Sequence, residues 1–73
     1  MAYLTIELKT NDEGGTAAEV KYSGKDLRVA EQTYHTVLAT AATSGRRCHA
    51  CVILDSEGMS VAQRAYVTEQ VTE

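Results

Sequence analysis

The chain has 73 residues, a net charge of -3 and neither Phe nor Trp, and Leu, Ile and Val together supply only 14 of its residues. A chain this short makes a single domain, 1–73, whose small core stabilises a monomer only marginally. Such domains are commonly stabilised by a partner subunit, so we expect a homodimer. The acidic balance argues against nucleic acid as a partner, because phosphate contacts require a basic surface.

The N-terminal residues (MAYLTIELKT) have neither the basic and apolar regions of a secretory signal nor the roughly 18 apolar residues of a membrane span. We therefore expect a cytoplasmic location and no association with a membrane. The two cysteines are then expected to be reduced thiols, because disulfides are rare in the cytoplasm.

Residues 3–9 (YLTIELK) alternate between apolar and polar side chains, which is the period of a half-buried β-strand. We expect Leu4, Ile6 and Leu8 to face a helix that covers the strand. The residues that follow, 11–15 (NDEGG), are typical of a turn, because Asn, Asp and Gly tolerate left-handed backbone.

A second alternating segment follows the turn, and it places Ala18, Val20 and Tyr22 on the inward side. Two alternating segments joined by a glycine-containing loop predict a β-hairpin. The hairpin alone would leave one apolar face without cover, so the next element is expected to pack on it.

The hydrophobic period changes to that of an α-helix in residues 23–45. Apolar side chains recur at spacings of three and four, the pattern of an amphipathic helix, at Leu27, Ala30, Tyr34, Val37, Leu38 and Ala41. Ser23 and Asp26 have the spacing of a capping box, and Gly45 is placed to end the helix. We predict a long helix packed across one face of the hairpin.

Residues 48–54 (CHACVIL) precede a turn-forming stretch and are rich in Val, Ile and Leu. They predict a third strand. Because this strand is apolar on both sides, we expect it at the centre of the sheet or at an edge that a second subunit covers.

The C-terminal residues allow more than one interpretation. Ser60 as an N-cap and Gln63 at the capping-box position favour a helix, which gives a ββαβα order. The same residues tolerate strand geometry, which would give a second hairpin and a ββαββ order. A third alternative makes 47–57 helical as well. The preferred prediction is a small two-layer α+β domain with a C-terminal helix.

Residues 46–51 (RRCHAC) contain both cysteines, three positions apart. In a strand, Cys48 and Cys51 point to opposite faces and cannot share a metal or a disulfide. In a helix or turn they would lie together, and with His49 they could contribute to a zinc site completed across a dimer interface. The preceding arginines would favour a thiolate, so a redox pair is another alternative. We favour core cysteines and expect neither metal nor cofactor.

The sequence has no spacing typical of a catalytic constellation or a phosphate-binding loop, so we expect no enzyme but a non-enzymatic protein that binds another macromolecule. The expected interface is the sheet face opposite the helix, to which the alternation assigns Tyr3, Thr5, Cys51 and Ile53. An alternative is a nucleic-acid-binding regulator with a helix-turn-helix near the C-terminus, using Arg46, Arg47 and Arg64.

Overall fold

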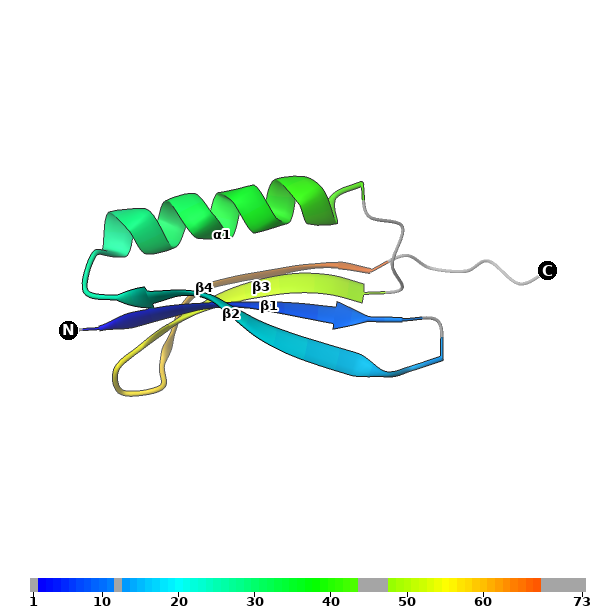
Figure 1. The fold of residues 1–73 in the computed structure, drawn as a ribbon, viewed down its shortest axis with the longest axis horizontal. Helices are drawn as coiled ribbons and strands as arrows, with labels where there is room; N and C mark the ends of the chain where they lie inside the picture. The colour runs from blue at the N-terminus through cyan, green and yellow to red at the C-terminus, as the bar shows by residue number, and fades with distance from the viewer. Residues whose placement is uncertain (1, 12, 44–47, 68–73) are drawn as a thin grey trace.

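The fold is a four-stranded antiparallel sheet with one helix on one face (Figure 1). The structure, a computed structural model, describes residues 2–11, 13–43 and 48–67. Its elements are β1 (Tyr3–Thr10), β2 (Thr16–Gly24), α1 (Leu27–Ala41), β3 (Cys48–Asp55) and β4 (Ser60–Val67). The order across the sheet is β2-β1-β3-β4, so the two central strands come from the two halves of the chain.

The predicted α+β class is confirmed, and the predicted C-terminal helix is wrong. Residues Ser60–Val67 form β4, which pairs with β3 in a second hairpin, so the order is ββαββ. The Ser60 hydroxyl donates to Oε1 of Gln63 at 3.1 Å and does not cap a helix. The turn before β4 is closed by Asp55, whose Oδ1 accepts from the backbone N–H groups of Glu57 and Met59.

The first hairpin agrees with the sequence prediction. Asn11 fixes its turn, because Oδ1 of Asn11 accepts from the backbone N–H of Glu13 at 3.0 Å and of Gly15 at 2.9 Å. Gly14 has φ 87°, a left-handed conformation that glycine adopts without steric cost. Gly14 therefore acts as expected, whereas Asn11 shapes the turn through its side chain and not through a left-handed backbone, and Asp12 lies outside the described residues.

A bulge in β2 changes which side chains share a face. Thr5 pairs with Tyr22 while Ile6 pairs with Val20, so Lys21 is the extra residue. Tyr22 packs against the core under α1, whereas Val20 lies on the other side of the sheet and is 56% exposed. The prediction that Ala18, Val20 and Tyr22 share an inward face is therefore wrong.

Helix α1 carries the predicted apolar stripe, and its ends differ from the prediction. The buried residues are Ala30, Tyr34, Val37, Leu38 and Ala41. Asp26, not Ser23, is the N-cap, and its Oδ1 accepts from the backbone N–H of Arg28 at 3.0 Å. The helix ends at Ala41, and Gly45 lies outside the described residues.

The helix covers the face of the sheet opposite to the predicted one. Thr5 is fully buried, and its hydroxyl donates to the carbonyl oxygen of Ala30 at 3.0 Å. Cys51 and Ile53 pack against the helix, and the expected inward residues of β1 lie on the other face. The side chains that decide the choice are tyrosines, because their rings bury a large apolar area while their hydroxyls reach polar surroundings. Tyr3, Tyr22 and Tyr66 all pack on the helix side of the sheet.

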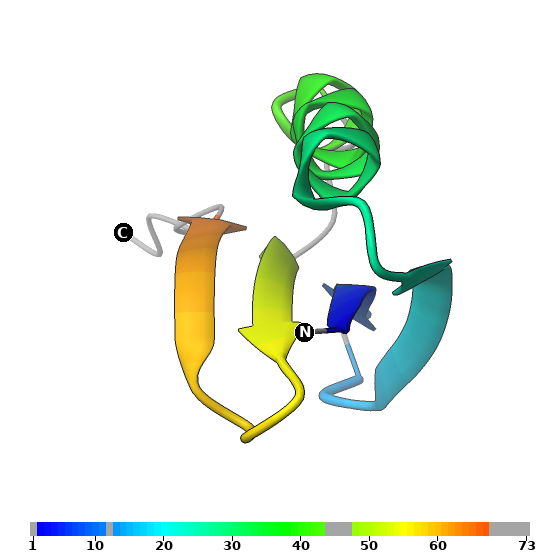
Figure 2. The ribbon, with the colours of Figure 1, turned by 90° about the vertical axis from the view of Figure 1, so that its left-hand side faces the viewer.

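Seen along the strands, α1 lies above the central strands β1 and β3, and edge strand β4 stands to one side of it (Figure 2). No described element lies on the opposite side of the sheet (Figure 2). Within the part of the chain that the structure describes, no helix is long and apolar enough to cross a membrane.

Candidate functional site

The two faces of the sheet differ in their chemistry. The face that carries α1 holds all the charged residues of the four strands, which are Glu7, Lys9, Glu19, Lys21, Asp55 and Arg64. The opposite face contains uncharged side chains only. We call this second face the open face.

The strand register arranges the open face in four rows that run from β2 to β4. The rows are Ser23–Leu4–Leu54–Ser60, Val20–Ile6–Val52–Gln63, Ala18–Leu8–Ala50–Ala65 and Thr16–Thr10–Cys48–Val67. Large aliphatic side chains occupy the two central positions of the first row and three of the four positions of the second, and alanines dominate the third. The surface is therefore raised at the first two rows and lower at the third row.

The open face is exposed to an unusual degree for such apolar residues. Val20 and Val67 are 56% and 63% exposed at the two edges, and the central leucines and Ile6 are only half-buried. A contiguous uncharged apolar surface on a small domain marks a place where another surface packs. This makes the open face the candidate functional site.

A hollow of about 450 Å³ lies on the lower part of the open face. The side chains of that face that line it are Leu8, Ala50, Val52, Gln63 and Ala65. It exists because two alanines of the third row, Ala50 and Ala65, are shorter than their neighbours. An apolar side chain from another molecule would fit there better than on a flat sheet.

Beneath the helix lies a polar cluster that the sequence prediction missed. The Glu7 side chain is 6% exposed and that of His49 is 3% exposed, and Oε2 of Glu7 is 2.7 Å from Nε2 of His49. Oε1 of Glu7 lies 3.4 Å from Nζ of Lys9 and 3.6 Å from Nζ of Lys21. Two of the buried polar atoms, Oε1 of Glu7 and Nδ1 of His49, have no hydrogen-bond partner. The cluster is an acid–base pair without access for a substrate.

The pKa of Glu7 reflects competition between burial and its partners. Burial alone would raise the pKa of this carboxyl. The hydrogen bond with His49, together with the nearby positive charges of Lys9 and Lys21, outweighs burial and holds the pKa below its ordinary value. Glu7 is therefore a carboxylate at neutral pH.

The two cysteines lie on opposite faces of β3, as the strand alternative requires. Cys51 is fully buried under α1, and burial raises the pKa of its thiol to about 11. Cys48 lies in the fourth row of the open face and is half-buried. Both thiols are free. Cys51 is thus a core residue, as the favoured interpretation expects, whereas Cys48, which the same interpretation places in the core, lies outside it.

The same geometry bears on the zinc and redox alternatives. His49 shares the helix side with Cys51, so Cys48, His49 and Cys51 do not converge on one point. Among the residues that the structure describes, no group of three or more His, Cys, Asp or Glu side chains is arranged to hold a metal. The three residues therefore do not fit a zinc ion within one chain.

The interface residues predicted from the sequence lie on the covered face, and this assignment is corrected. Thr5, Cys51 and Ile53 are buried under α1, and Tyr3 packs against the same core. The predicted alternation of side chains along each strand is correct, but the helix covers the face predicted to be open. The uncovered surface is formed by the other set of alternate residues, including Leu4 and Ile6.

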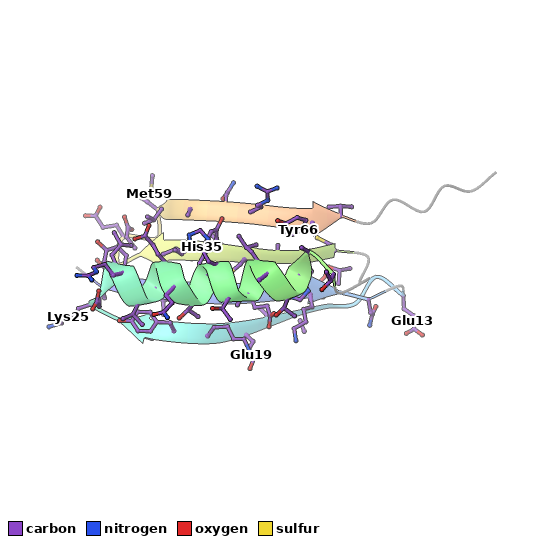
Figure 3. The ribbon with its side chains drawn as sticks, turned by 90° about the horizontal axis from the view of Figure 1, so that it is seen from above. Glu13, Glu19, Lys25, His35, Met59 and Tyr66 are labelled. Atoms are coloured by element: carbon purple, nitrogen blue, oxygen red, sulfur yellow. The ribbon has the colours of Figure 1, made fainter. Side chains whose placement is uncertain are left out.

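The nucleic-acid alternative rested on three arginines and a C-terminal helix. Arg46 and Arg47 lie outside the described residues. Arg64 lies on strand β4, where its guanidinium stacks over the ring of Tyr66 at 4.9 Å, so the helix-turn-helix interpretation is wrong. Arg64 and Tyr66 flank a second hollow, of about 370 Å³, between β4 and the helix residues Tyr34 and His35. Figure 3 shows the positions of His35 on α1 and Tyr66 on β4.

One signal in the sequence could have located the open face. On β3, Ala50, Val52 and Leu54 are uncharged and apolar, whereas the alternate residues include His49. On β1, the alternate residues include Glu7 and Lys9. The purely aliphatic alternates of both strands therefore belong to one face, and the register β1–β3 brings them together.

Comparison with known proteins gives no match: no protein family model, no curated protein and no solved structure is significantly similar to this chain.

Proposed function

We propose that the protein is a non-enzymatic binding protein and that the open face is the surface through which it associates with another protein surface. The observation that carries the proposal is the separation of charge between the two faces. The charged strand residues gather beneath and beside α1, and the exposed face has none. In an antiparallel sheet with one solvated face, the polar residues of each strand usually point to the solvent. Here the solvated face carries the uncharged, mostly apolar residues instead, which is typical of a face that a partner covers.

Catalysis is less well supported by the geometry. The described acid–base pair, Glu7 and His49, lies under the helix with both side chains less than a tenth exposed. A general acid or base must come within hydrogen-bonding distance of a reacting group. Binding is therefore the function that the accessible surface supports best.

The native Cys48 thiol offers a direct test, because it lies on the open face. Its rate of labelling by a small maleimide would be measured inside cells of the organism that encodes the protein and in dilute purified protein. We expect strong protection in the cells, because a partner surface excludes the reagent. Equal rates in both preparations would contradict the proposal. Cys51 is the internal control: because it is buried under α1, it should stay unlabelled in both preparations as long as the chain is folded.

A further inference from the structure

We infer that the occupant of the open face is a second copy of this chain, so that two sheets pack face to face between two outer helices. This inference rests on the proposed function and names the partner of the same surface. Three properties of the open face support it: its lack of charge, its size and its relief.

The lack of charge permits self-association. Two copies of a chain with a net charge of -3 repel one another, and the repulsion is largest where like charges meet. Because the charged strand residues lie on the helix side, two open faces meet without opposing charges. A charged partner would find no complementary group on this face, whereas a second copy presents a surface of the same uncharged chemistry.

The size of the face is sufficient for a stable dimer. Four strands of eight or nine residues cover about 27 Å by about 19 Å, so two such flat faces would bury on the order of 1,000 Å² in total, and side-chain relief adds to that area. A biological interface with good complementarity should clear about 1,000 Å². The face therefore reaches the required area only when most of its four rows are used.

The relief of the face makes it self-complementary. A two-fold axis that lies in the interface and runs across the strands places the second row of one copy over the third row of the other. Val52 then lies over Ala50 of the other copy, and Val20 over Ala18, so bulky side chains enter the region lowered by alanines. An axis along the strands would place Leu4 against Leu54 and leave the alanine rows facing one another. The geometry therefore favours the axis across the strands.

The same axis predicts which residues meet at the ends of the sheet. The first row faces the fourth, so Leu54 lies opposite Cys48 of the other copy, with the two sheets about 10 Å apart. The two Cys48 residues are then about 20 Å apart along the strands, because three row spacings of about 7 Å separate the end rows. An axis along the strands would instead bring the two Cys48 thiols within reach of a short linker.

The test is sedimentation equilibrium of the reduced, purified chain, whose monomer mass is 7.9 kDa, at micromolar concentrations. We expect twice that mass. Val52→Lys places a charge at the centre of the face and should weaken the dimer roughly 100-fold or more. Val20→Lys, at a site already 56% exposed, tests the same face if Val52→Lys prevents folding. Val29→Lys on the helix is the matched control and should leave the mass unchanged.

Two outcomes would overturn the inference. A wild-type chain that remains monomeric while Cys48 is protected in cells would assign the open face to a different protein and leave the proposed function standing. A dimer that survives both charge substitutions on the open face would place self-association elsewhere, for example at the edge of β4. If Cys48 is equally reactive in cells and in dilute protein, the proposed function fails as well.

Cross-linking then tests the orientation. With a bismaleimide of about 10 Å reach, Leu54→Cys should give a covalent dimer through the native Cys48 of the other copy, and wild type should not. The double variant Leu54→Cys with Cys48→Ser should give none. Cross-linking of wild type through Cys48 would overturn the axis across the strands.

Discussion

The two faces of one sheet have opposite relations to solvent and to charge. Beneath α1, the sheet presents tyrosines, Ile53, Cys51 and a buried Glu7–His49 pair, and charged side chains surround that core. On the open face, aliphatic side chains meet solvent without a charged neighbour. The face that α1 covers therefore contains the charged strand residues, and the open face, which contains only uncharged and mostly apolar side chains, has no cover within the chain.

The sharpest contrast is between the neighbouring residues Ile53 and Val52, which point to opposite faces. Ile53→Ala should lower the free energy of unfolding by about 3 kcal/mol, because it empties a fully buried site. Val52→Ala should cost the dilute chain about 1 kcal/mol or less, because its side chain is only half-buried. Urea denaturation followed by circular dichroism measures both. Equal losses in dilute solution would remove the distinction between the faces.

The thiols report on the two faces through their reactivity. In dilute native protein, one thiol per chain should react with a disulfide reagent, and it should be Cys48. Cys51 should react at least roughly 100-fold more slowly than Cys48, because its pKa of about 11 leaves little thiolate and burial blocks access. Two thiols should react in denaturant, and Cys48→Ser should leave none reactive in the native chain. Rapid reaction of both native thiols would contradict the assignment.

The polar cluster under the helix should be sensitive to removal of its charge. Glu7→Gln should destabilise the fold by about 2 kcal/mol, because it leaves the buried His49 and two lysines without their carboxylate. Glu19→Gln is a matched control, since Glu19 pairs with Glu7 across the strands but is exposed. Its effect should stay within about 0.5 kcal/mol. A comparable loss in both variants would show that burial of the pair contributes nothing.

The smallest expected effect is on the pH dependence of stability. The pKa of Glu7 is lowered in the folded state, so the folded chain binds fewer protons than the unfolded chain between the two pKa values. The contribution of Glu7 is therefore complete above the unfolded pKa and is lost as the pH falls through the folded pKa. The denaturation curves of wild type and Glu7→Gln should converge as the pH falls from about 6 towards about 3. These two values bracket the ordinary pKa of a glutamate side chain, about 4.3. A difference independent of pH would contradict the prediction.

The sequence predicts the first hairpin, the helix stripe and the third strand, because each has a hydrophobic period long enough to be distinctive. It does not predict β4, whose alanines and Gln63 suit a helix as well as a strand. Pairing with β3 decides the conformation, and that contact lies outside the local sequence.

The phase of the sheet is also beyond local sequence. Alternation shows that Leu4 and Thr5 point to opposite sides, but it does not show which side the helix covers. The bulge at Lys21 shifts the alternation of β2 by one residue and places Tyr22 with Thr5. Neither the bulge nor the tyrosine packing has a signature in the period. The residues that alternation predicts for the uncovered face, Thr5, Cys51 and Ile53, therefore lie under the helix, although they do form one alternating set.

The central pairing of β1 with β3 also determines when the fold can form during synthesis. Tyr3 pairs with Asp55, so β1 has no central neighbour until most of the chain has left the ribosome. Until then β1 is paired only with β2, and Leu4, Ile6 and Leu8 lack the neighbours that β3 supplies on the open face. Long-range pairing of this kind slows folding and leaves nascent chains open to aggregation. The topology thus makes closure of the four-stranded sheet a late, long-range step in folding.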